Sequence, residues 1–240
     1  MAQVFVMFMS PAKKPYVKPK LETPKFSKMF LSRTYAAKLR SGVEIYRSNR
    51  KERAYLIEQQ LRAEGISVPD ELITRHLGDN LIEVYTRGHG MSLGNILSSL
   101  SRKKKIAVVT ELVENLARMH SLGIYHGDIH EENVIVDPQK KVRFIDFEYA
   151  GHLSKLKGAE DLNVKKLFDD LEEVLVICNY HILPHKALTP KQSFNFLILV
   201  IGTYLKHYDD SRFPGLKKKI RDRIVEYLQV KCPKFMKYLK

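Results

Sequence analysis

The segment YHGDIHEENVIVDPQKKVRFIDFEY, residues 125–149, constrains the fold of this chain more than any other. Two short apolar runs, VIV and VRFID, flank the turn-forming residues DPQKK, and this is the pattern of a β-hairpin. If the turn is centred between residues 139 and 140, residues whose numbers sum to about 279 lie opposite each other. This register predicts that Asn133 lies beside Asp146 at the open end of the hairpin.

The sequence on both sides of this hairpin predicts helices. Residues 104–120 carry apolar side chains at helical spacing on one face, and Gly123 follows as a helix-ending residue. A short helix is expected near residues 93–100. Longer helices are expected near residues 161–183, 191–208 and 216–229.

The chain before residue 88 has a different pattern. Strands are expected in residues 29–47 and in a hairpin around residues 78–80, with one helix over residues 49–65 capped by Asn49. Residues 10–28 hold four prolines and six lysines without an apolar period, so they predict an extended basic arm. The expected organisation is α+β, with a basic extension in 1–28, a small antiparallel sheet with one helix in 29–87, and a mostly helical part in 88–240.

Charge and cysteine content limit the environment and partners of the chain. Lys and Arg number 41 against 27 Asp and Glu, a formal charge of +14, which fits either contact with polyanions such as nucleic acid or an ordinary solvated surface. The two cysteines are far apart and form no metal or redox motif, which fits a reducing, cytoplasmic location. The N-terminal run AQVFVMFM is a poor signal peptide, and the apolar run Phe194–Ile201 is too short to span a membrane, so we expect a soluble protein without a membrane span.

Three oxygen-bearing side chains are candidates for catalysis. Asn133 and Asp146 offer the amide and carboxylate oxygens that Mg²⁺ accepts as ligands, and Asp128 lies five residues before Asn133 in an irregular loop. A metal site beside a carboxylate base is what phosphoryl transfer to a hydroxyl requires.

The same residues resemble a known family. His126-Gly127-Asp128, four further residues and Asn133 resemble the catalytic loop of the protein-kinase-like superfamily, and Asp146-Phe147-Glu148 stands where that family has its metal-binding D-F-G. Glycine in the loop and glutamate after Phe147 look like the atypical branches: RIO kinases, the KEOPS-complex kinase, Kdo/lipopolysaccharide kinases, and aminoglycoside and choline kinases. The resemblance implies a two-lobed kinase-like fold with ATP and Mg²⁺ as cofactors.

The resemblance also implies roles for individual residues. Asp128 would be the catalytic base, and Asn133 and Asp146 would bind the metal and the nucleotide phosphates. The segment from Glu83 to Gly88 is similar to the hinge, so Glu83 and Tyr85 would contact the nucleotide.

The phosphate-clamping part of the family pattern is weaker in this sequence. Glu44 stands where the ATP-binding lysine is expected, so Lys38 on the preceding strand is assigned to that role, with Arg47 as the alternative. Glu52, on the first helix, is expected to be the partner of that cation. Residues 1–41 contain no glycine, so no glycine-rich loop can cover the phosphates.

The family also suggests how the catalytic loop is supported. Asp161, at the start of a helix, is expected either to hold the loop or to act only as a helix-terminal carboxylate. His126 is expected to support the loop through hydrogen bonds.

Several functions remain open at this point. An atypical serine/threonine protein kinase fits the compact chain best, and a small-molecule kinase of the aminoglycoside, choline or lipopolysaccharide type is the alternative. A kinase-shaped binding module without catalysis, a basic nucleic-acid-binding protein, and a metallohydrolase that uses His126, Asp128 and His130 are the rivals.

Overall fold

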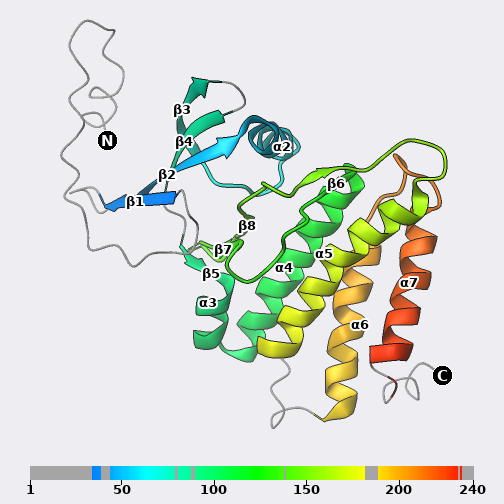
Figure 1. The fold of residues 1–240 in the computed structure, drawn as a ribbon. Helices are drawn as coiled ribbons and strands as arrows, with labels where there is room; N and C mark the ends of the chain where they lie inside the picture. Colours follow the sequence, from blue (N-terminus) through cyan, green and yellow to red (C-terminus); the bar gives the residue numbers. More distant parts are fainter. Residues whose placement is uncertain are drawn as a thin grey trace, which may run out of the picture.

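The computed structural model describes residues 34–38, 44–78, 81–87, 90–137, 139–181, 189–231 and 233. The structure is a two-lobed α+β fold, with a small antiparallel sheet at one end and a group of helices at the other (Figure 1). This confirms the expected fold class. The predicted basic arm in 1–28 and the strand expected near residue 30 lie outside the described residues, and the lobe boundary after residue 87 stays a prediction.

The N-terminal sheet has four antiparallel strands in the order β1-β2-β4-β3. These strands are β1 (Thr34–Lys38), β2 (Glu44–Lys51), β3 (Glu71–Gly78) and β4 (Leu81–Arg87). Strands β3 and β4 form the hairpin that the sequence predicted around residues 78–80.

Helix α2 (Glu52–Ala63) follows β2 directly and buries Ala54, Ile57 and Leu61, the three residues whose spacing predicts its apolar face. The prediction that Asn49 caps this helix was wrong. Strand β2 continues to Lys51 because its backbone pairs with β4 along this whole stretch, and Asn49 lies opposite Glu83 in that ladder.

The helices of the C-terminal lobe agree with the predicted ranges to within two residues at most ends. They are α3 (Leu93–Ser99), α4 (Arg102–Ser121), α5 (Glu160–His181), α6 (Pro190–His207) and α7 (Leu216–Lys231). Figure 1 shows α4, α5, α6 and α7 packed side by side beneath the sheet. Leu112, Val113 and Leu116 of α4 are fully buried, and each contributes about 1.5–3 kcal/mol to stability through burial.

Two small sheets of short strands lie around the hairpin predicted in residues 134–146. Strand β7 (Val134–Val136) pairs with β5 (Met91–Ser92) and with β8 (Val142–Phe144), while β6 (Ile124–Tyr125) pairs with β9 (Gly151–His152).

The hairpin formed by β7 and β8 exists as predicted, but its register differs by one residue. Val136 faces Val142 and Val134 faces Phe144, so the next residue, Asn133, faces Ile145 rather than Asp146. The turn sets this register, because the Asp137 N–H donates to the Lys141 carbonyl at 3.0 Å and the Asp137 carboxylate accepts the Lys141 N–H at 2.8 Å.

Arg143 links this hairpin to the chain that leaves α2. Its guanidinium donates to the Val68 carbonyl at 3.0 Å and pairs with Asp70 at 3.2 Å and with Asp137 at 3.3 Å. The Phe144 N–H also donates to the Ser67 carbonyl at 3.3 Å. Hydrogen bonds and an ion pair therefore connect the segment after α2 to the hairpin of β7 and β8.

Among the helices of the described ranges, none has the length and apolar character needed to cross a bilayer.

Candidate active site

The candidate catalytic loop, residues 126–133, lies between β6 and β7 and has a glycine of unusual backbone geometry at its second position. Gly127 has φ of +78°, a conformation that L side chains rarely adopt, and a Cβ at this position would lie 2.6 Å from the Tyr149 carbonyl oxygen. The loop passes so close to the segment after Asp146 that only glycine fits. This explains why the motif here is His-Gly-Asp.

Asp170 on α5 holds this loop from below. Its buried carboxylate accepts the backbone N–H of His126 at 2.6 Å and that of Gly127 at 2.9 Å. It also bonds His120 Nε2 at 3.1 Å, and His120 Nδ1 bonds the Tyr204 hydroxyl at 2.7 Å. A buried carboxylate with several charge-assisted hydrogen bonds is a strong anchor, and here it fixes the first two residues of the loop.

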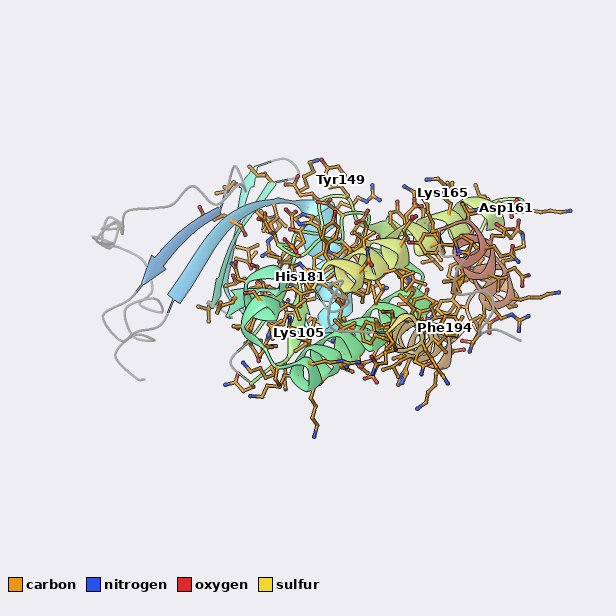
Figure 2. The ribbon with its side chains drawn as sticks, turned by 90° about the horizontal axis from the view of Figure 1, so that it is seen from below. Lys105, Tyr149, Asp161, Lys165, His181 and Phe194 are labelled. Carbon is orange, nitrogen blue, oxygen red and sulfur yellow. The ribbon has the colours of Figure 1, made fainter. Side chains whose placement is uncertain are left out.

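The expectation that Asp161 holds the loop was wrong. Its side chain is 95% exposed and pairs with Lys219 at 3.1 Å, and Figure 2 shows it at the end of α5 opposite His181. Asp170 could have been found from the sequence, since it follows the helical period of the buried residues Leu167, Leu171 and Val174. A carboxylate in an apolar stripe signals a buried partner.

His126 supports the loop from the other side, as expected. Its Nε2 lies 3.0 Å from the Ile145 carbonyl oxygen, and its ring packs against Phe147 with centroids 4.9 Å apart. Because a carbonyl only accepts, Nε2 carries the proton. Burial lowers the pKa of His126, so the ring is neutral at pH 7.

This arrangement speaks against the metallohydrolase alternative, because that site would need His126 as a metal ligand beside Asp128 and His130. His126 Nε2 is instead bonded to the Ile145 carbonyl. Among the described residues, no group of three His, Cys, Asp or Glu side chains is arranged to hold a metal ion.

Asn133 is bonded to Asp128 on one side and open on the other. Its Nδ2 donates to the Asp128 carbonyl at 2.9 Å and to the Asp128 carboxylate at 3.0 Å. The side chain is only 1% exposed, and its buried Oδ1 has no hydrogen-bond partner within the described residues. A buried acceptor without a donor is costly, and a cation at this position would satisfy it.

Asp146 follows this pair at the open end of the hairpin. The Ile145 N–H donates to the Asn133 carbonyl at 3.0 Å, which brings the chain at Asp146 next to Asn133 despite the shifted register. Asp146 has φ of +61°, a left-handed conformation that is uncommon outside glycine. Such strain of about 1–3 kcal/mol is typical of functional positions.

A cation from β2 pairs with a buried carboxylate of α2 above this centre. Glu58 is 1% exposed, forms an ion pair with Arg50, and pairs with Arg62 at 3.1 Å. Burial and, to a smaller extent, the charge of Arg62 lower the pKa of Arg50 to about 10, while the negative charge of Asp146 opposes this decrease. Arg50 therefore remains charged at pH 7 and lies within the electrostatic field of Asp146.

Sequence reasoning missed Arg50 and Glu58, although Glu58 stands in the apolar period between Ile57 and Leu61. Glu52, the expected partner of the phosphate-binding cation, is at the first position of α2. It lines a surface cavity with Lys51, Arg53, Leu56, Ile57, Gln60 and His152.

The remaining sequence-predicted residues lie in the N-terminal sheet. Lys38 ends β1 opposite Glu44, and Tyr85 lies in β4 opposite Arg47, but their side chains are outside the described part of the structure. Glu83 is buried in β4.

Comparison with known proteins agrees with this geometry. Residues 66–168 match the family described as "Protein kinase domain". The chain is 30% identical over 97 residues to the dual specificity protein kinase zakA of Dictyostelium discoideum, a match covering 38% of this chain and 11% of that protein. It is 31% identical over 106 residues to the KEOPS complex subunit Bud32 of Pyrococcus abyssi, covering 43% of this chain and 46% of that protein.

The chain thus spans about a tenth of the first relative and just under half of the second. The matched range includes Asp128, Asn133 and Asp146 but ends before Asp170, and it begins after Arg50 and Glu58. The two-lobed fold and these partial matches are thus all similarities to protein kinases.

Proposed function

We propose that this protein is an ATP- and Mg²⁺-dependent phosphotransferase that transfers the γ-phosphate of ATP to a hydroxyl group. The observation that carries the proposal is Asn133, whose amide nitrogen is bonded to Asp128 while its buried oxygen has no partner in the described residues. One side chain thus fixes a carboxylate and offers a ligand to a cation. A kinase centre needs both functions in one cleft.

The donor set fits Mg²⁺, which prefers carboxylate and amide oxygens. Asn133 and Asp146 would hold the ion, and when bound it would neutralise and orient the phosphates. Asp128, 39% exposed, would orient the acceptor hydroxyl and take its proton. Asp170 and His126 keep this loop in place before substrate binds.

The cation that contacts the ATP phosphates is proposed to be Arg50. Its ion pair with Glu58 joins a strand to the helix beside it, and the charge of Asp146 acts on it. Lys38 and Arg47 remain the alternatives, with Glu52 as the partner of such a cation, and Glu83 and Tyr85 remain proposed nucleotide contacts.

The test is phosphate transfer from γ-labelled ATP with and without Mg²⁺. The wild type should transfer label, while Asp128→Asn and Asp146→Asn should lose about 100-fold or more in rate, because each variant keeps its shape and loses a charge. Asparagine also tolerates the left-handed backbone of position 146. Asp161→Asn is the matched control on an exposed aspartate and should behave as wild type.

Full transfer by Asp146→Asn would refute the metal assignment. Binding of ATP by the wild type without any turnover would favour the non-catalytic kinase-like module. ATP as donor also fits an intracellular, cytoplasmic location.

The acceptor is proposed to be a serine or threonine of a protein, as in an atypical protein kinase, because one of the relatives is named a dual specificity protein kinase and the match to the protein kinase domain covers the catalytic loop. A small alcohol of the choline, aminoglycoside or lipopolysaccharide type is the alternative. Label recovered in precipitated protein supports the first acceptor, and label on a soluble compound supports the second.

A second candidate function is contact with nucleic acid through the start of α4. Residues Arg102, Lys103, Lys104 and Lys105 occupy its first turn, which contains no acidic residue. Cations at a helix N-terminus oppose the helix dipole at a cost of about 0.3–1 kcal/mol each. Phosphate groups of a nucleic acid would offset this repulsion.

Three of these cations are exposed in the part of the chain that the structure describes. Lys105 is partly buried and donates to the His181 carbonyl at 3.0 Å, and Figure 2 labels the two residues near each other. Residues 102–104 are exposed. Replacing those three by alanine should weaken binding of a 20-nucleotide RNA about 10-fold or more and reduce its salt dependence. The same replacement at Lys217, Lys218 and Lys219 of α7 removes equal charge and should have a smaller effect; equal effects would indicate net charge alone.

A further inference from the structure

His130 lies beside the carboxylate of Asp128, inside the same loop. Its Nε2 is 3.7 Å from Asp128 Oδ2, and both side chains are partly exposed. Asp128 Oδ2 is also the oxygen that accepts the hydrogen bond from Asn133 Nδ2 at 3.0 Å. His130 Nε2 and Asn133 Nδ2 therefore both lie near the same carboxylate oxygen. Within the described residues, Asp128 Oδ1 has no hydrogen-bond partner.

The tautomer of His130 is fixed by the backbone of the loop. The Glu132 N–H donates to His130 Nδ1 at 3.3 Å, so Nδ1 is an acceptor and the proton of the neutral ring is on Nε2. The atom that faces Asp128 is thus a donor without any need for a positive charge on the ring.

A second carboxylate lies near this histidine from α5. The pKa of Glu173 is raised, mainly by burial and then by the charge of Glu172. Of its neighbours in the catalytic loop, His130 opposes this increase and Asp128 adds to it. Glu173 is exposed and accepts no hydrogen bond from His130 in the structure, so the nearest carboxylate to Nε2 is that of Asp128.

We propose that His130 is a positioning residue for phosphoryl transfer. This inference rests on the proposed function. Together with Asn133 it holds Asp128 Oδ2, so that Oδ1 is the atom that receives the proton of the acceptor hydroxyl. The 3.7 Å separation exceeds a hydrogen bond, and bonds of this kind in substrate-free sites commonly shorten when substrates bind. His130 then fixes which face of the carboxylate meets the acceptor.

Three substitutions at this position separate a donor from a space-filling role. His130→Gln places an amide N–H where Nε2 lies, His130→Asn places its amide nearer the position of Nδ1, and His130→Ala removes both. The measurements are kcat, the KM for ATP and the melting temperature of each variant.

The expected result is a kcat about 100-fold lower in His130→Ala and His130→Asn, since a misplaced catalytic group has an effect of this size. The KM for ATP and the melting temperature should stay close to wild type. His130→Gln should recover most of the rate. In Asp128→Asn, the further change His130→Ala should have little effect, because the two residues act as one unit.

An active wild type with an equally active His130→Ala would overturn the inference and leave the proposed function standing. His130→Gln as slow as His130→Ala would also overturn it, since a donor at Nε2 would then not be the feature that matters. A wild type without turnover would refute the proposed function itself.

Discussion

The carbonyl oxygen of Tyr149 lies 2.6 Å from the point where a Cβ on Gly127 would be. The two segments that carry Asp128 and Asp146 are thus in backbone contact, and a glycine at the second position of the catalytic loop makes this possible.

Gly127→Ala should therefore cost more stability than the backbone angle alone explains. Gly158→Ala is the matched control, because Gly158 also has a positive φ of +85° and no atom within 4 Å of the added Cβ. We expect about 1 kcal/mol for Gly158→Ala and about 3 kcal/mol for Gly127→Ala, where the clash adds to the strain. Urea denaturation measures both, and equal losses would show that the Tyr149 carbonyl moves away freely.

Asp170→Asn should destabilise the protein by about 3–5 kcal/mol, because an amide cannot accept all the donors that now converge on the carboxylate. Asp169→Asn changes the neighbouring residue, whose half-exposed side chain pairs with Lys165 within the described ranges, and should stay within about 0.5 kcal/mol of wild type. The free energies of unfolding decide, and a mild Asp170→Asn would mean that the loop is held by other contacts.

Stability should decrease as the pH falls below the ordinary range of histidine. The pKa of His126 is lowered in the folded state by burial, so below about pH 6.5 the unfolded chain binds a proton that the native ring does not. This part of the stability is complete above the unfolded pKa and is lost as the pH decreases toward the folded one.

His126→Gln keeps a donor for the Ile145 carbonyl and cannot titrate, so its unfolding free energy should change less between pH 7 and pH 5 than that of wild type. Parallel pH profiles of the two proteins would contradict the assignment of this pH dependence to His126.

Glu58→Gln should raise the KM for ATP about 10-fold, because Arg50 and Arg62 would then repel each other without their shared carboxylate. Glu52→Gln on the same helix tests the residue expected from the sequence and should leave the KM nearly unchanged. Steady-state kinetics with varied ATP gives both values, and the reverse outcome would restore Glu52 as the partner of the cation.

Local patterns in the sequence were sufficient for most of the secondary structure and for the centre of the site. The stripe of α4 and the turn residues of the hairpin formed by β7 and β8 each report on nearby residues, so they predicted their elements correctly. The one-residue error in the hairpin came from the turn, where hydrogen bonds of Asp137 decide the register.

The parts that sequence reasoning missed depend on contacts between distant segments. Asp170 accepts a hydrogen bond from His126 of the loop, which lies 44 residues earlier in the chain. Arg50 interacts electrostatically with Asp146 from a different part of the sequence. A family motif places residues in order along the chain, but it does not say which buried carboxylate of a helix faces them.

The position of Asp170 has a practical consequence for anyone who designs a shorter piece of this protein. The match to the protein kinase domain ends at residue 168, two residues before this aspartate, and Tyr204 of α6 completes the same hydrogen-bonded chain through His120. A fragment cut at the end of the similarity would keep every residue proposed for catalysis and lose the buried support beneath them. We therefore expect the smallest stably folded unit to extend through α6.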